Sequence, residues 1–285
     1  MPSLKKIFTL LFSAIIFIAA CSQQEDAYKS PQGYNLNKPE KFFMSESLRE
    51  ISGIAFNKGS NNMIYAEQDE DGKLFYFKLG NQKVNAVKFA GHGDYEDLAI
   101  CKGFVILLRS DGTLFTFPIS IIAKDEIDSV EEWKKILPEG EYEGMYADEA
   151  TGNIYVLCKN CKEDNGKTHH GYIYKLNNDG NISSNGSFTI DIKKIEELSG
   201  EKKIEFHPSA LSMNPQTEQW YILSSVNKLL VVADKNWNVQ QVYHLNPSLF
   251  IQPEGMAFDS NNNLYISNEG GDMSKGNILK FAFAK

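Results

Sequence analysis

The chain alternates short apolar runs with turn-forming Gly, Asn and Asp residues along most of its length. A related phrase recurs five times, opening on a small or acidic residue, usually passing through Gly or Ser, and then entering an apolar stretch. A second apolar run with β-branched and aromatic residues follows each phrase and is typical of a β-strand. The five phrases are REISGIAF from Arg49, YEDLAI from Tyr95, YEGMYAD from Tyr142, HPSALSM from His207 and PEGMAFD from Pro253.

The spacing of the phrases predicts a repeat fold. Counted from the second residue of each phrase, the repeats advance in steps of 46, 47, 65 and 46 residues and begin at Glu50, Glu96, Glu143, Pro208 and Glu254. A period in the mid-forties with several short strands per unit is typical of β-propeller blades. The sequence therefore predicts one all-β domain over residues 36–285, a five-bladed β-propeller with an insertion in the longest step.

The fifth repeat lacks one of its four strands. After its phrase it offers only two further apolar runs, LYISN from Leu264 and ILKFAF from Ile278. The segment Lys41–Met44 precedes the first repeat, and we predict that it forms the outer strand of the last blade and closes the ring. An open edge would leave unpaired backbone groups, which native sheets avoid.

Two other elements are expected beside the regular strands. The outer strand of blade two is expected near Trp133–Leu137, after a polar stretch, and a short helix is expected over Asp191–Leu198 in the insertion. The lengths of these insertions indicate nothing about chemistry.

The first 20 residues have the pattern of a secretory signal peptide. Lys5 and Lys6 precede an apolar run of 14 residues, which is too short to span a membrane. The run ends in Ile-Ala-Ala-Cys21 and resembles the bacterial lipobox, whose cysteine receives diacylglycerol and becomes the mature N-terminus. An ordinary signal peptide with a chance cysteine is the alternative. We expect residues 21–35 to be a flexible tether, and the protein to be lipid-anchored in the cell envelope at the outer membrane, with the membrane face left open.

Composition and charge narrow the range of partners. The chain has 42% hydrophobic and 12% aromatic residues, enough to fill the interfaces between blades, and a net charge of −8. No basic run offsets this acidic balance, so nucleic acid is excluded as an expected partner and cations are more natural ligands. We expect a monomer that contacts the membrane through its lipid.

Taken in order, the five phrases resemble the SdiA-regulated family of bacterial propellers, over residues from about 36 to 285. Similar turns occur in NHL-repeat and gluconolactonase-like propellers, to which the resemblance is distant. The resemblance implies a five-bladed propeller with calcium at a site within it, and it establishes no enzymatic activity. The chain departs from the pattern at Pro208 and Ser209, where a Glu is missing.

Four glutamates are the candidate metal ligands: Glu50, Glu96, Glu143 and Glu254. Each opens an innermost strand, so all four should converge at one mouth of the channel, where like charges raise the cost of ionisation unless a cation offsets it. Calcium takes six to eight oxygen ligands, and Asp97 and backbone carbonyls could add to the set. In the alternative interpretation, each Glu accepts hydrogen bonds from a neighbouring blade and ties the ring together.

We therefore expect a binding or scaffolding module with an unknown protein or small-molecule ligand. The alternative is a metal-dependent hydrolase of lactonase or phosphoesterase type, for which the side chains that could line the channel are Asn268, Glu269, Glu67 and Arg109. None of these has a distinctive spacing, and the sequence contains no GxSxG, HExxH or P-loop motif. Catalysis is an open question at this stage, with no catalytic residue assigned.

Cys158 and Cys161 form a CxxC motif within the insertion. In a compartment that permits disulfides, a local bridge is the leading interpretation. A zinc site formed with His169 and His170 is the rival, although the spacing matches no zinc motif. Cys101 is expected to be a buried thiol in a strand.

Overall fold

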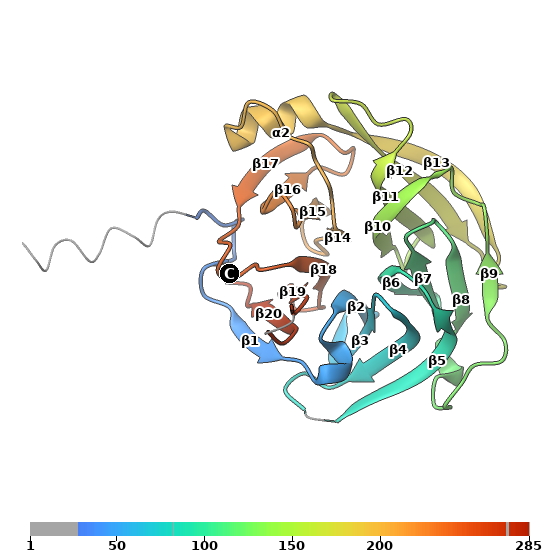
Figure 1. The fold of residues 1–285 in the computed structure, drawn as a ribbon. Coiled ribbons are helices and arrows are strands. Elements are labelled where there is room, and N and C mark those ends of the chain that lie inside the picture. Colours follow the sequence, from blue (N-terminus) through green and yellow to red (C-terminus); the bar gives the residue numbers. More distant parts are fainter. Residues whose placement is uncertain (1–27, 82, 272–273, 285) are drawn as a thin grey trace, which may run out of the picture.

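The computed structural model describes residues 28–81, 83–271 and 274–284. Five four-stranded antiparallel sheets surround a central channel, so the five-bladed all-β propeller is confirmed (Figure 1). The predicted signal peptide, Cys21 and most of the tether lie outside the described residues. Among the described residues, no helix is long and apolar enough to cross a membrane.

Each blade runs from the channel outward in chain order. Blade one contains β2 (Ile51–Asn57), β3 (Ser60–Gln68), β4 (Asp71–Phe77) and β5 (Val84–His92). Blade two contains β6 (Tyr95–Cys101), β7 (Phe104–Arg109), β8 (Leu114–Pro118) and β9 (Glu131–Trp133). Blade three contains β10 (Gly140–Ala147), β11 (Asn153–Cys161), β12 (Thr168–Leu176) and β13 (Ile182–Asp191). Blade four contains β14 (Ala210–Met213), β15 (Trp220–Ser224), β16 (Leu229–Ala233) and β17 (Val239–His244).

Blade five is closed by the N-terminal segment, as predicted. It contains β18 (Pro253–Phe258), β19 (Leu264–Asn268), β20 (Asn277–Phe281) and, outermost, β1 (Glu40–Phe43). Strand β1 pairs antiparallel with β20, from Glu40 opposite Lys280 to Phe43 opposite Asn277. The first and last segments of the fold therefore share one sheet.

Helical elements lie outside the blades. The helix α2 (Ile192–Ser199) begins where the sequence predicts it, because the Asp191 side chain accepts a hydrogen bond from the Lys194 N–H at 3.2 Å. It ends at Gly200, whose φ of 79° is readily adopted by glycine. Two 3₁₀ turns, η2 (Glu46–Leu48) and η3 (Ile119–Ile121), complete the described helices.

The outer strand of blade two lies earlier than expected. The expected segment was Trp133–Leu137, but β9 ends at Trp133, which pairs with Leu114. Leu137 is instead buried in the interface between blades two and three, directly before Pro138. The apolar residues after Trp133 thus serve packing between blades and form no strand.

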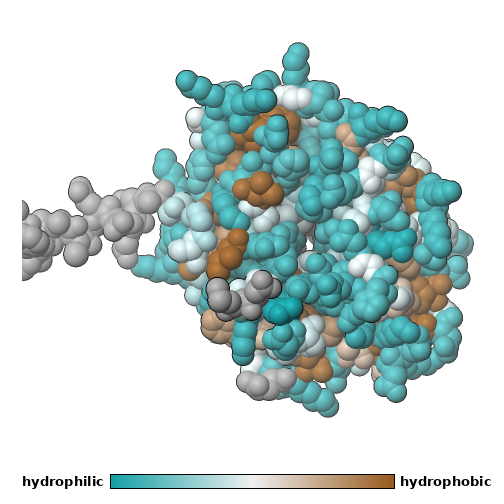
Figure 2. Space-filling model, in the orientation of Figure 1, coloured by the Kyte–Doolittle hydropathy of each residue, from teal (hydrophilic) through white to brown (hydrophobic). Residues whose placement is uncertain are grey.

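The hydrophobic core is divided into five clusters, one at each interface between neighbouring blades. The cluster between blades four and five also takes in Tyr34 and Leu36 from the segment before β1. The Tyr34 hydroxyl donates to the Asn262 carbonyl at 2.7 Å and so fastens this segment to blade five. The face seen in Figure 2 is predominantly hydrophilic, with hydrophobic residues in isolated patches, as expected when the apolar side chains fill the interfaces.

The inner strands approach most closely at one level of the channel. A Cβ on Gly53 would lie 2.5 Å from the Asp97 Oδ1 atom, and one on Gly255 would lie 2.3 Å from the Ser52 carbonyl oxygen. The Asp97 carboxylate accepts hydrogen bonds from the Leu98 and Met145 N–H groups at 2.8 and 2.6 Å, which joins blades two and three. We call this level of close contacts between neighbouring inner strands the waist of the channel.

Closure by the N-terminal segment should dominate the stability of the domain. Replacing Leu36, which is 2% exposed, by Ala should lower the free energy of unfolding by about 2–5 kcal/mol, because it opens a cavity in the interface between blades four and five. Deleting residues 36–48 should cost more, against a total of about 5–15 kcal/mol for a typical domain. Chemical denaturation of the soluble domain measures both changes.

The matched control is Phe43→Ala on β1. Phe43 is 66% exposed, so its removal should change the free energy of unfolding by about 0.5 kcal/mol or less. An unchanged melting temperature after deletion of residues 36–48 would contradict the structural importance of the closure.

Candidate functional site

Three of the four predicted glutamates occupy the same repeat position. A register shift lies near the start of three innermost strands, between Tyr95 and Asp97, between Tyr142 and Gly144, and between Pro253 and Gly255. The residue at each shift is a glutamate, namely Glu96, Glu143 and Glu254. Such an extra residue is a β-bulge, which commonly redirects a side chain next to a functional site. The inner strands thus present one carboxyl group each from blades two, three and five at the same mouth of the channel.

Glu50 occupies a different position from the other three. The corresponding register shift in blade one lies between Ile51 and Ile54, so the equivalent residue is Ser52, and Glu50 precedes it by two residues. The Glu50 carboxylate pairs with the Arg49 guanidinium at 3.3 Å. The equal place that the sequence suggested for Glu50 is therefore wrong, because the bulge in this strand lies two residues later.

The three equivalent carboxyl groups are buried together. Burial, followed by the charge of Glu143, raises the pKa of Glu96 to about 9 and that of Glu254 to about 8. Burial also raises the pKa of Glu143 itself. Glu96 and Glu254 therefore tend to keep their protons near neutral pH unless another positive charge reaches them.

A second set of carboxyl groups completes the ring. Burial and then the charge of Glu50 raise the pKa of Asp69 to about 6, and burial and then Asp69 raise the pKa of Glu269 to about 7. Asp94 acts on both Asp69 and Glu96 and so links the two sets. We call the whole set the acidic ring: Glu50, Asp69, Asp94, Glu96, Glu143, Glu254 and Glu269.

Sequence reasoning missed two members of the ring, Asp69 and Asp94. Asp69 directly follows Gln68, the last residue of β3, which pairs with Ile51 of β2. Glu269 directly follows Asn268, the last residue of β19, which pairs with Pro253 of β18. An alignment of the second strands of the repeats indicates Asp69 as a further acidic residue at this mouth of the channel. From the sequence, Glu269 is a candidate residue of the alternative hydrolase only.

A lysine stands at the same repeat position in blade three. Lys159 follows Cys158, which pairs with Tyr142, and its ammonium group pairs with the carboxylates of Glu143 and, at 3.1 Å, Glu141. The pKa of Lys159 is raised by these carboxylates against the effect of burial. Lys159 thus supplies a second cation to the acidic ring, beside Arg49 at Glu50.

The ring is tied together by residues other than the four glutamates. Ser209 Oγ donates to the Pro253 carbonyl at 2.9 Å and Ser267 Oγ to the Ser52 carbonyl at 2.5 Å, which join blade four to five and blade five to one. Within the described ranges, no backbone N–H of a neighbouring blade donates to Glu96, Glu143 or Glu254. Two of them have side-chain partners: Lys159 pairs with Glu143, and Ser225 of blade four hydrogen-bonds to Glu254.

The donor chemistry of the ring suits a hard cation, although its carboxylates are not drawn together. Buried oxygens without a hydrogen-bond partner lie on Asp69 (Oδ1), Glu67 (Oε2) and Asn268 (Oδ1), on strands that border the ring. In the described part of the chain, one group of three His, Cys, Asp or Glu residues has its possible ligand atoms within 4.8 Å of one another, and it is Cys158, Cys161 and Asp164. No three carboxylates of the acidic ring come as close together. An ion would therefore have to draw the ring side chains inward.

The other predicted hydrolase residues are engaged elsewhere. The Arg109 guanidinium pairs with Asp111 at 2.8 Å in a hairpin of blade two. The Asn268 amide donates to Asn277 and to the Leu249 carbonyl. Glu67 is fully buried and accepts a hydrogen bond from the Gly53 N–H at 2.5 Å. These contacts hold strands together, whereas Glu269, the fourth candidate, belongs to the acidic ring.

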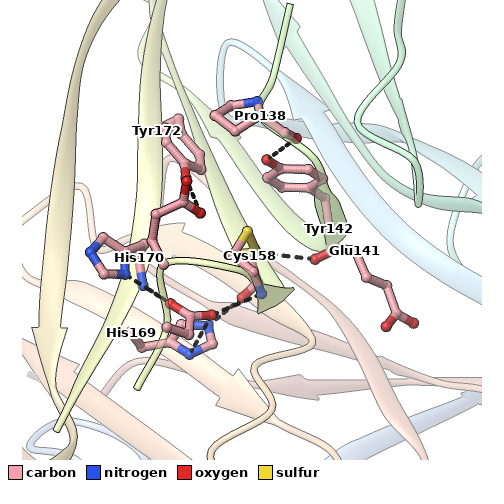
Figure 3. Close-up of a disulfide and its surroundings, with 10 residues drawn as sticks. Pro138, Glu141, Tyr142, Cys158, His169, His170 and Tyr172 are labelled. Carbon is pink, nitrogen blue, oxygen red and sulfur yellow. Dashed lines mark hydrogen bonds and ion pairs between the residues drawn. A yellow bond between two sulfur atoms is a disulfide. The ribbon is translucent and has the colours of Figure 1, made fainter. Parts of the chain in front are cut away.

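Cys158 and Cys161 are joined by a disulfide with a Cα–Cα distance of 5.9 Å (Figure 3). Asp164 accepts hydrogen bonds from the N–H groups of Cys161 and His170 at 3.0 and 2.7 Å and so shapes the loop. The ring of His169 contacts the Cys158 carbonyl. The histidines thus support the disulfide-bonded loop that carries Lys159. Cys101 is a buried free thiol.

These features define a five-bladed propeller with an acidic channel mouth. The family model that matches residues 30–271 is SdiA-regulated, and the chain belongs to this family. No curated protein matches the sequence.

Solved structures share the fold at low sequence identity. The glutaminyl cyclase of Myxococcus xanthus has a TM-score of 0.57 at 13% identity, with 86% of this chain and 96% of that chain covered. A luciferin-regenerating enzyme has a TM-score of 0.55 at 10% identity, covering 86% and 95%. Regucalcin from Agrobacterium tumefaciens, described as calcium-binding, has a TM-score of 0.50 at 12% identity, covering 88% and 95%. These similarities show the fold alone.

The raised pKa values predict that stability falls as the pH rises without added divalent ions. Between the unfolded carboxyl pKa of about 4.5 and the folded values of about 8 and 9, the folded state holds protons that the unfolded state has released. The melting temperature should therefore fall from pH 7 to pH 9. Measuring above pH 7 avoids the opposite slope from His169, whose pKa is lowered by burial.

Glu96→Gln should flatten this slope because it removes the carboxyl group whose pKa is raised to about 9. The control Glu131→Gln changes an exposed carboxylate on β9 and should leave the slope as it is. Equal slopes for all three proteins would show that the ring carboxyl groups titrate normally.

Proposed function

We propose that this protein is a lipid-anchored propeller of the cell envelope that binds a divalent cation, calcium in the first place, at the acidic ring. It would act as a binding or scaffolding module. The observation that carries the proposal is the convergence of buried carboxyl groups whose pKa values reach about 8 and 9. Seven carboxyl groups face two local cations, Lys159 and Arg49, so the ring can ionise fully only when a further positive charge such as a bound cation replaces its protons.

Glu96, Glu143 and Glu254 are the residues that would hold the ion, because they lie at equivalent bulges on three inner strands. Glu50 and Glu269 would add ligands from blades one and five. Lys159 must give way when the ion binds, since its ammonium group already pairs with Glu143. A calcium-binding protein of the same fold supports this proposal only weakly at 12% identity.

Calcium should raise the melting temperature of the soluble domain, and chelation should reverse the rise. A ligand that binds the folded state alone at 100 times its Kd stabilises it by about 2.7 kcal/mol. The double variant Glu96→Gln/Glu254→Gln removes two ligands while keeping side-chain size, so it should abolish the response. Calorimetric titration with CaCl₂ and thermal melts measure both effects.

The matched control is Glu131→Gln/Glu201→Gln, which removes the same charge from exposed positions away from the channel and should bind calcium like the unmodified domain. Absence of calcium binding to the unmodified domain, or equal binding by the channel variant, would refute the cation site.

Lys159 provides a test with the opposite sign. Lys159→Gln removes the competing ammonium group, so calcium should bind about tenfold more tightly, or about 1.4 kcal/mol. Weaker binding in this variant would show that Lys159 helps to organise the site and does not compete with the ion. The same titration gives the answer.

Anchoring is proposed from the lipobox-like end of the leader at Cys21. Cys21→Ser should move the protein from the membrane fraction to the soluble fraction, because the acyl chains would no longer be attached. Fractionation with immunoblotting measures this, with Cys101→Ser as the control, since that thiol lies within the fold. Membrane retention of the Cys21 variant would contradict lipid anchoring.

A further inference from the structure

The far end of the channel contains a cavity of about 400 Å³. Its wall is formed by the later residues of the inner strands β2, β6, β10, β14 and β18, so all five blades contribute. The acidic ring lies at the opposite, amino-terminal ends of these strands. No residue of the acidic ring lines the cavity, so the cavity is separate from the proposed cation site.

The wall of this cavity is mainly apolar and adaptable. Each inner strand contributes three consecutive residues, and most of their side chains are aliphatic, aromatic or methionine. Met145, Met213 and Met256, on blades three, four and five, are three of the seven methionines in the chain. Methionine side chains are flexible and polarisable, so a wall rich in them can adjust to a bound molecule.

The charged groups at the rim are already paired. Asp148 accepts hydrogen bonds from residues of its own turn, and Asp259 accepts them from nearby asparagines and Tyr265. Lys58 and Glu149 form an ion pair of 3.6 Å between turns of blades one and three. Both side chains are well exposed, so this pair is weak and can open. With three carboxylates and one lysine, the rim keeps a net negative charge, which disfavours anionic ligands.

Two hydroxyl groups in the lining are available for a ligand. Ser212 is 4% exposed and Tyr146 is partly buried, and neither side-chain hydroxyl has a hydrogen-bond partner among residues 28–81, 83–271 and 274–284. Both hydroxyl groups can therefore form a hydrogen bond with a ligand oxygen or nitrogen. A cavity of this size that combines apolar side chains with polar groups is typical of small-molecule sites.

We propose that this cavity binds a neutral, mainly apolar small molecule that carries a hydrogen-bonding oxygen or nitrogen. The apolar wall provides affinity, the hydroxyl groups of Ser212 and Tyr146 orient the ligand, and the acidic rim disfavours anions. The protein thus has two sites of opposite chemistry on one axis, one for a cation and one for an apolar ligand.

The probe for this site is N-phenyl-1-naphthylamine, a neutral dye whose fluorescence rises in apolar surroundings. Titration of the soluble domain should give saturable binding of one dye per protein. Two variants of partly exposed lining residues, Ala147→Trp and Met213→Glu, should weaken binding at least tenfold, because they fill the cavity or place a charge in its wall. Melting curves verify that both variants fold.

The control is Val226→Ser, which removes the most exposed large hydrophobic side chain and lies in the turn after β15, at the end of the channel with the acidic ring. It should leave dye binding unchanged. Should the two lining variants fail to fold, Ser260→Trp obstructs the rim from an exposed position and should weaken binding in the same way.

Three results would overturn the proposal. They are dye binding without saturation, equal affinity in the obstructed and unmodified proteins, and loss of dye binding on Val226→Ser alone, which would place the dye on the other face. A fourth contradicting result is self-association through this face, in which a second copy of the chain covers the cavity. Sedimentation at increasing protein concentration would detect it as a rise in mass.

Discussion

Every feature of this protein depends on closing the ring. Each blade buries its apolar faces only against its two neighbours, so opening the ring would expose both faces of one of the five hydrophobic interfaces. Closure is made by backbone hydrogen bonds between β1 and β20, supported by the burial of Leu36 and Tyr34 against blades four and five. The diameter of the channel, and hence the distances across its mouths, follow from this closure.

The closed ring gives the two channel mouths different chemistry. Repeat positions at the start of the inner strands carry carboxyl groups, whereas positions near their ends carry aliphatic, aromatic and methionine side chains. Small residues and Asp97 at the waist allow the strands to approach closely between the two regions. A charge change at one mouth is therefore expected to act on the cation site without altering the apolar cavity.

Departures from the repeat are concentrated where the site is specialised. Blade three places Lys159 where blades one and five place acidic residues, and a disulfide holds the strand end from which it projects. At the equivalent position, blades two, three and five have glutamates, blade one has Ser52 and blade four has Ser209. The Ser209 hydroxyl joins blade four to blade five. The acidic ring is thus asymmetric, with its strongest mutual repulsion between Glu96, Glu143 and Glu254.

The sequence by itself determined the number of blades, the closing role of Lys41–Met44 and the helix at Asp191, because repeat spacing, strand composition and capping are local properties. It also identified Glu96, Glu143 and Glu254 from their equal places in the repeats. The tertiary structure decided the shift of Glu50, the pairing of Lys159 with Glu143, and the short β9, since bulges and packing between blades set these. It also created the cavity, because residues some 45 positions apart meet only when the ring closes.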